Sequence, residues 1–169
     1  MRVAPMLKIV FDTNVLLDYF GVACTERDHA AAVDLVSELV KRSVPFVVTP
    51  TILKDFNYLF SAALKRDIRE HEGEVTERDA RAIQAMAEAA LESVLDVGTI
   101  ASEDLATCEM ARSLCKSHND YEDNLVAAVA LRIGAHCIVT RDVAFAKHSP
   151  VLCVTAGEAL DFVRAGAWG

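Results

Sequence analysis

Short apolar runs rich in β-branched residues, separated by helical stretches, place the strongest constraint on how this chain can fold. Clear runs occupy residues 8–11, 46–49, 137–140 and 151–154, and residues 95–100 form a weaker one. Nearly continuous apolar runs of this length are typical of strands buried on both faces, as in a parallel sheet. Because the runs alternate with helices, we predict an α/β fold in which helices cover both faces of an open parallel sheet.

The helices are predicted from apolar residues at helical spacing. Residues 26–42 form an amphipathic helix, and helices around 52–70 and 77–93 are expected to form a hairpin beside the core. Residue types that cap helices support these boundaries. Pro50 suits the first turn of the helix that follows the second strand.

Four further helix starts are predicted from capping residues. Thr76 and Thr155 each precede an acidic residue by three positions, which is the spacing of a capping box. Ser102 is expected to cap the next helix, and Asn119 or Asp120 to begin the one after it. The helices thus fill the intervals between the predicted strands.

Length and composition predict one compact domain covering residues 1–169. The chain has a mass of 18.4 kDa and is 53% hydrophobic with only 7 glycines and 4 prolines, which excludes a disordered or fibrous protein. Its five cysteines are never spaced as C-x-x-C, so neither a disulfide framework nor a zinc ribbon is indicated. No run approaches the roughly 20 apolar residues of a membrane span, and no signal peptide is recognised. We therefore expect a cytoplasmic protein that makes no contact with a membrane.

Four carboxylates fall where they can converge at one edge of the predicted sheet. Asp12 and Asp142 directly follow the first and third clear strands, and Asp55 and Asp123 lie about one turn into helices. In parallel sheets, sites form beyond the carboxyl ends of the strands. Hard oxygen ligands suit Mg²⁺ or Mn²⁺, which bind few carboxylates and keep several waters. Singly, each acid has another explanation as a helix cap, a partner of a helix dipole or a turn residue.

Three sequence segments resemble the PIN-domain family in order and spacing. The resemblance in order and spacing extends over nearly the whole chain, from residue 7 to about residue 163. The segments are Phe11–Leu17, Asp120–Leu125 followed by Ala127, Ala128 and Ala130, and Ile138–Asp142 with Phe145.

This resemblance implies a three-layer α/β/α sandwich with a parallel sheet of four or five strands. It also implies a nuclease that uses Mg²⁺ or Mn²⁺ to hydrolyse RNA, in many members as the toxin of a toxin–antitoxin pair. Asp12, Asp123 and Asp142 match the acidic positions of the family. Asn14 matches a polar residue that orders the first acid, and Thr140 matches a hydroxyl beside the last.

Two acidic positions need separate interpretation. The family usually has Glu where this chain has Asp55, and the shorter side chain is expected to act as an outer ligand or as a base that orients water. Asp120 is interpreted first as the cap of its helix. Because it lies three residues before Asp123 and hence on nearly the same helix face, it is interpreted second as a supporting residue of the site. Asp12 and Asp142 are predicted direct ligands, and Asp123 a ligand directly or through water.

The charge of the chain argues against a broad nucleic-acid surface. The formal net charge is −8 and the isoelectric point is near 5.1, so RNA contact must come from a local basic strip or from a partner. The partners that we expect are RNA, an antitoxin protein and a second copy of the chain. No histidine has the spacing of a metal ligand, so His118 and the other four histidines are expected to have surface or packing roles. Arg141 and Lys147 are interpreted first as solvated residues and second as contacts for a phosphate near Asp142.

Two other function classes remain open at this stage. A phosphatase or phosphoacceptor domain would use Asp12 as a nucleophile, but such domains place a second Asp where this chain has Asn14. A non-catalytic PIN fold would act as a binding module, which the acidic charge and Asp55 both allow.

Overall fold

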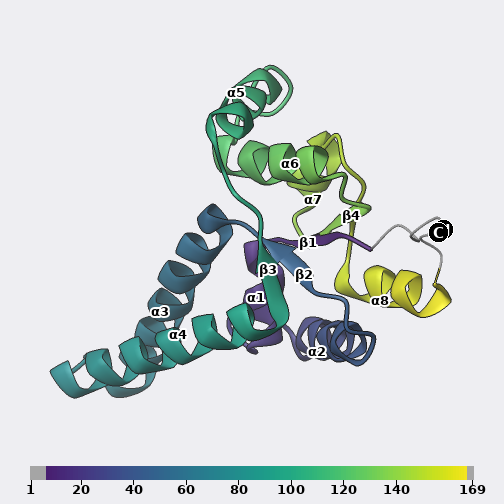
Figure 1. Cartoon of the computed structure of the whole chain (residues 1–169). Helices are drawn as coiled ribbons and strands as arrows, with labels where there is room; N and C mark the ends of the chain where they lie inside the picture. The colour runs from purple at the N-terminus through teal and green to yellow at the C-terminus, as the bar shows by residue number, and fades with distance from the viewer. Residues whose placement is uncertain (1–6, 167–169) are drawn as a thin grey trace.

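The computed structural model describes residues 7–166, so the ends of the predicted domain 1–169 lie outside the described residues. Its centre is a parallel sheet of five strands in the order β3-β2-β1-β4-β5 (Figure 1). The first strand is central, and Val10 is aligned with Val47 on one side and with Ile138 on the other. The strands are β1 Ile9–Phe11, β2 Phe46–Val48, β3 Gly98–Ile100, β4 Cys137–Val139 and β5 Cys153–Val154.

Helices lie on both faces of this sheet. Helices α1, α2 and α8 gather on one face, and α5, α6 and α7 lie on the other (Figure 1). The predicted α/β fold with a helix-covered parallel sheet is therefore confirmed. The helices are α1 Thr13–Tyr19, α2 Glu26–Lys41, α3 Pro50–Glu72, α4 Glu77–Val97, α5 Leu105–Leu114, α6 Tyr121–Ile133, α7 Val143–His148 and α8 Ala156–Ala165.

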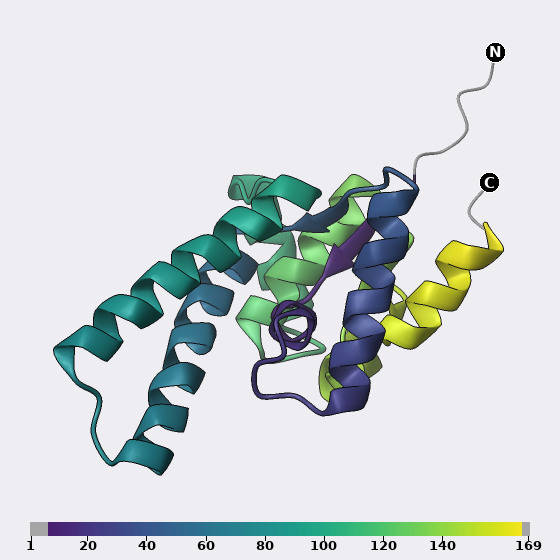
Figure 2. The ribbon, with the colours of Figure 1, turned by 90° about the horizontal axis from the view of Figure 1, so that it is seen from below.

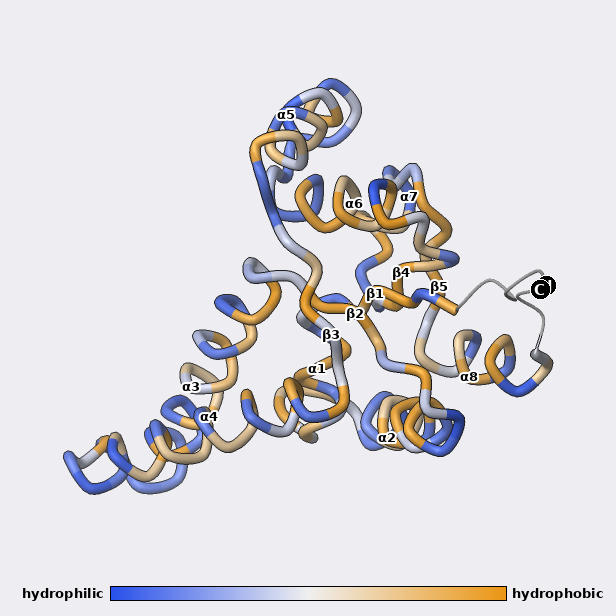
Figure 3. Tube along the Cα trace, in the orientation of Figure 1, coloured by the Kyte–Doolittle hydropathy of each residue, from blue (hydrophilic) through white to orange (hydrophobic). Residues whose placement is uncertain are grey.

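The pair α3 and α4 forms an arm that extends away from the sheet. The two helices run side by side in both views (Figures 1 and 2). The far end of this arm is largely hydrophilic, whereas the central strands β1, β2 and β4 are hydrophobic (Figure 3). Within residues 7–166, no helix is both long enough and apolar enough to cross a membrane.

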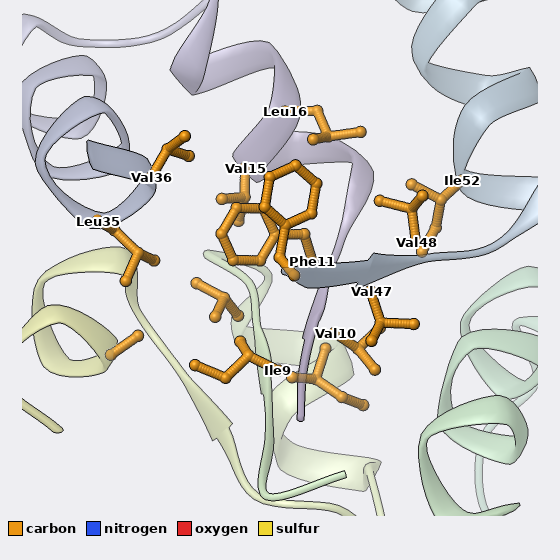
Figure 4. Close-up of a cluster of buried hydrophobic side chains, with 14 of the residues drawn as sticks. Ile9, Val10, Phe11, Val15, Leu16, Leu35, Val36, Val47, Val48 and Ile52 are labelled. Atoms are coloured by element: carbon orange, nitrogen blue, oxygen red, sulfur yellow. The ribbon is translucent and has the colours of Figure 1, made fainter. Parts of the chain in front are cut away.

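The core lies on both faces of the sheet, and a large part of it packs against helices α1 and α2. Val10, Phe11 and Val48 are fully buried, as are Leu16 and Leu35 on the two helices (Figure 4). Burial on both faces explains why the three central strands β1, β2 and β4 have apolar residues at every position, whereas the edge strands β3 and β5 are less buried. Burial of this apolar surface supplies the main driving force for the fold.

An aromatic stack joins the carboxyl end of β1 to the neighbouring strand β2. The rings of Phe11 and Phe46 stack with centroids 4.3 Å apart and nearly parallel planes. Gly98 lies beside this stack, and a Cβ added there would be 2.7 Å from the Phe46 ring and 2.8 Å from the Val94 carbonyl oxygen. Only glycine fits at this position without a shift of the neighbouring atoms.

Most predicted caps are confirmed, and one is wrong. Thr76 and Thr155 form capping boxes, and Asp120 caps α6. The helix assigned to Ser102 is instead capped by Asp104, whose carboxylate accepts a hydrogen bond from the Thr107 backbone N–H. That hydrogen bond, with one from Arg132 on α6, lowers the pKa of Asp104 to about 2. A carboxylate cap that accepts hydrogen bonds from both the Thr107 backbone and the Arg132 guanidinium is more favourable than the serine two residues earlier.

Candidate active site

A cavity of about 390 Å³ opens at the carboxyl ends of the central strands. Its walls come from the ends of β1 and β4, the first turns of α3 and the start of α6. The four predicted acids all line it. The lining residues are Asp12, Thr13, Asn14, Leu17, Thr51, Ile52, Asp55, Tyr58, Leu59, Asp120, Glu122, Asp123, Val126 and Asp142.

Asp12 follows β1 and caps α1. Its Oδ1 accepts a hydrogen bond from the Thr13 backbone N–H at 2.7 Å. Its Oδ2 accepts two more, from Asn14 Nδ2 and from Thr140 Oγ1, each at 2.7 Å. Asn14 Nδ2 also donates to Thr140 Oγ1 at 3.0 Å. The ends of β1 and β4 are thereby joined by polar side chains around the first acid.

Asp142 follows β4 and caps α7. Its Oδ1 accepts a hydrogen bond from the Phe145 backbone N–H at 2.9 Å, and its own backbone N–H donates to Thr140 Oγ1 at 3.0 Å. Thr140 therefore contacts both strand-end acids, which agrees with its expected supporting role. Phe145 is buried and anchors the short helix that Asp142 begins.

Asp123 lies in the first turn of α6 and contacts a residue that the sequence did not indicate. His118 Nε2 lies 2.9 Å from Asp123 Oδ2, and the His118 side chain is only 16% exposed. Asp120 accepts hydrogen bonds from two backbone N–H groups of this turn, so its predicted role as the cap is confirmed. The expectation that His118 has only a surface or packing role is wrong in this respect. Its proximity to Asp123 depends on the path of the chain between α5 and α6, which no local spacing reveals.

Asp55 lies on the α3 wall and is paired with a cation. Lys54 Nζ lies 3.0 Å from Asp55 Oδ1 and 3.1 Å from Glu122 Oε1. The lysine thus bridges the first turns of α3 and α6. Glu122 is the sixth acidic residue that lines the cavity, after the four predicted acids and Asp120, and the sequence prediction did not include it among the site residues.

The acids influence one another electrostatically. Burial raises the pKa of Asp12, and the negative charge of Asp142 raises it further. Burial also raises the pKa of Asp123, opposed by the hydrogen bond from His118 and reinforced by the charges of Asp120, Asp12 and Asp142. Three separate elements therefore bring like charges close enough to repel, and a bound cation would relieve that repulsion.

The chemistry of these side chains suits a hard divalent cation, although their positions are set by internal contacts. Within residues 7–166, no three His, Cys, Asp or Glu side chains are grouped as the ligands of one metal ion. The carboxylates of Asp12 and Asp142 cap the first turns of α1 and α7, and the carboxylate of Asp55 forms an ion pair with Lys54. A carboxylate that accepts one or two hydrogen bonds at a helix start still has free lone pairs for a cation. Mg²⁺ commonly contacts only one or two carboxylates directly, so these side chains remain suitable ligands.

The basic residue beside Asp142 has a structural partner. Arg141 Nε lies 3.2 Å from Asp18 Oδ2, and the Arg141 backbone N–H donates to Asn14 Oδ1 at 3.1 Å. Burial raises the pKa of Asp18 to about 6, partly offset by the charge of Arg141. The interpretation of Arg141 as merely solvated is therefore wrong, because it forms an ion pair with a buried acid.

The sequence matches the family model described as PIN domain over residues 8–144, which is most of the chain. The chain belongs to the PIN-domain family. The motifs around Asp12, Asp123 and Asp142 all fall within this match, and of the quoted motif residues only Phe145 lies beyond it. Among curated proteins, no sequence matches the chain.

Solved structures show the same fold as this PIN domain. FitAcB from Neisseria gonorrhoeae has a TM-score of 0.61 with 17% identity, over 88% of this chain and 97% of that one. PAE2754 from Pyrobaculum aerophilum has a TM-score of 0.62 with 16% identity, over 94% and 90%. VapBC2 from Rickettsia felis, bound to a DNA fragment from their promoter, has a TM-score of 0.58 with 13% identity, over 88% and 98%.

Proposed function

We propose that this PIN domain is a Mg²⁺- or Mn²⁺-dependent endoribonuclease. The observation that carries the proposal is the convergence of Asp12, Asp123 and Asp142, from three elements, on one cavity at the carboxyl ends of the strands. Their mutual repulsion favours a cation between them. Membership of the PIN-domain family supports nuclease chemistry at these positions.

Each acid has a distinct role in this proposal. Asp12 and Asp142 would hold the ion directly, Asp123 directly or through water, and Asp55 as an outer ligand or a base that orients the attacking water. A bound divalent ion supplies a water of lowered pKa and offsets charge that builds on the phosphate oxygens. Asn14 and Thr140 keep the Asp12 carboxylate fixed through their hydrogen bonds.

The same cavity offers contacts for a nucleotide that do not depend on positive charge. The Tyr58 side chain lies on the α3 wall and is 70% exposed, and Leu59 beside it is also exposed. Stacking of an unpaired base on an aromatic ring contributes about 1–3 kcal/mol and tolerates any base. Because the chain is acidic overall, affinity for RNA would come from stacking and from the bound ion.

A protein partner is part of the proposal. Many PIN-domain proteins are toxins that a cognate antitoxin inhibits, and two of the structural relatives have the names FitAcB and VapBC2. We infer that this chain acts as such a toxin. Co-expression with the product of a neighbouring small reading frame would test the partner independently of RNA cleavage.

A non-catalytic binding module is the second candidate. It is favoured by the ion pair in which Lys54 neutralises Asp55, the residue at the position where the family usually has Glu. The two candidates differ in metal binding. A lapsed site would bind Mn²⁺ weakly or not at all in a calorimetric titration, whereas the nuclease would bind it stoichiometrically.

Cleavage of an end-labelled single-stranded RNA in Mn²⁺ tests the proposed activity. The sharpest variant is Asp142→Asn, because Asn caps helices about as well as Asp but cannot supply a carboxylate. We expect wild-type protein to cleave in Mn²⁺ and not in chelator, and Asp142→Asn to lose at least about 100-fold of the rate. Asp161→Asn on the exposed face of α8 is the control and should cleave normally. Equal cleavage by Asp142→Asn and wild type would overturn the assignment.

A further inference from the structure

His118 joins the segment between α5 and α6 to the acidic cavity. Its Nε2 lies 2.9 Å from Asp123 Oδ2, while the ring is mostly buried. With the carboxylate ionised, the ring nitrogen that faces Oδ2 carries the proton and donates it. The histidine therefore contacts one specific oxygen of a carboxylate that lines the candidate site.

Neighbouring side chains hold the His118 residue in place. Asn124, which is buried, donates from Nδ2 to the His118 carbonyl oxygen at 2.8 Å. On one face, the His118 ring stacks with His148 at the end of α7, with centroids 5.2 Å apart and planes inclined by 15°. Backbone and ring are thus both fixed, which is what a residue needs in order to fix another side chain.

The hydrogen bond restricts the Asp123 carboxylate without using both of its oxygens. Within the described residues, the only side-chain hydrogen bond of Asp123 is the one at Oδ2. A carboxylate held at one oxygen keeps its plane and presents the other oxygen. Partners of this kind orient metal ligands, and their loss typically costs about 10- to 100-fold in metal affinity.

We propose that His118 is a positioning residue that orients Asp123 for binding of the divalent ion through its free oxygen. This inference rests on the proposed function. It assigns the role to the hydrogen bond itself, so a side chain that restores an N–H at the same reach should restore the function. Simple packing of the 115–120 segment would give no such dependence on reach.

The test compares two polar substitutions by calorimetric titration with Mn²⁺. The Nε2 of the glutamine in His118→Gln can reach Asp123 Oδ2, whereas the shorter side chain in His118→Asn cannot. We expect His118→Asn to weaken Mn²⁺ binding by about 10-fold or more and His118→Gln to retain most of the affinity. His71→Gln is the matched control, because His71 is also paired with an acid, Asp67, but on the exposed arm.

Urea unfolding in chelator accompanies each titration, so that folding and metal binding are measured separately. A loss of Mn²⁺ affinity in His118→Asn with unchanged unfolding supports the proposal. Wild-type affinity for Mn²⁺ in His118→Asn would overturn it. It would also be overturned if His118→Asn and His118→Gln lost equal Mn²⁺ affinity together with equal folding stability. If wild-type protein bound no Mn²⁺, the proposed function would fail together with this inference, whereas an unaffected His118→Asn beside a Mn²⁺-binding wild type refutes this inference alone.

Discussion

Individual acids in the cavity are held by different partners, so equivalent substitutions have different consequences. Asp12 accepts hydrogen bonds from three groups, whereas Asp142 accepts one from a backbone N–H, and Asp55 forms an ion pair with its neighbour Lys54. Replacing Asp12 by Asn changes charge and at least one hydrogen bond at once. Asp142 and Asp55 therefore give cleaner tests of the site.

Asp55→Glu restores the side-chain length that is usual in the family. We expect the variant to keep or raise both Mn²⁺ affinity and RNA cleavage, because the longer carboxylate can reach past Lys54 into the cavity. Asp55→Ala, measured beside it, should lose activity. Loss of cleavage in Asp55→Glu with unchanged Mn²⁺ affinity would show that the site is built around the shorter acid.

Asp18 should make stability depend on pH. Its pKa is raised by burial to about 6, so the folded state binds a proton more tightly than the unfolded state does. As the pH rises from 4 through 6, this group lowers the free energy of unfolding, by up to about 1.4 kcal/mol per unit of pKa difference. Asp18→Asn lacks this effect.

Urea unfolding of both proteins between pH 4.5 and 7.5 measures the difference. The stability of Asp18→Asn relative to wild type should rise with pH over this window. A constant difference across the window would show that Asp18 keeps its ordinary pKa in the folded protein.

The elements of this fold were predictable to the extent that local sequence determines them. Continuous apolar runs predicted the strands, and hydrophobic spacing predicted the helices, because burial on both faces of a sheet leaves no room for polar residues. The cap at Asp104 was missed because Ser102 is also a suitable capping residue, and only Arg132, 28 residues away, distinguishes the two positions. His118 was missed although it lies only five residues before Asp123, because the irregular segment between them has no fixed spacing. Neither contact is indicated by helical or strand periodicity.

A substitution at Gly98 on the edge strand β3 tests how tightly this edge packs, through Phe46, against β1. Gly98→Ala would push a methyl group into the Phe46 ring, which stacks on Phe11 directly before Asp12. We expect a loss of roughly 1–3 kcal/mol in the free energy of unfolding, as is typical of overpacking.

Gly157→Ala is the matched control for this substitution. Its added Cβ meets no atom within 4 Å, and the residue lies in α8. Alanine there should be neutral or stabilise by up to about 1 kcal/mol. Similar unfolding curves for Gly98→Ala and wild type would show that the Phe46 ring moves aside without cost.

The molecule as a whole carries a net charge of −8, and its candidate site concentrates that charge in one cavity. The arm of α3 and α4 adds length without a basic surface, since residues 65–79 at its far end carry charges of both signs. Cations should therefore stabilise this protein selectively through the cavity. Ligands that bind only the folded state raise the melting temperature by mass action.

The melting temperatures of wild type and Asp142→Asn, each in chelator and in millimolar Mn²⁺, test the central claim most directly. The Asp142 charge raises the pKa of both Asp12 and Asp123, so its removal relieves repulsion, and like charges at roughly 4 Å in general repel by about 1–4 kcal/mol. The weakened interaction with the α7 N-terminus costs about 0.3–1 kcal/mol, which is smaller. Asp142→Asn should therefore melt higher than wild type in chelator and gain less from Mn²⁺. A variant that melts lower in chelator and responds to Mn²⁺ like wild type would show that Asp142 is a structural turn residue, and the proposed ion site would be wrong.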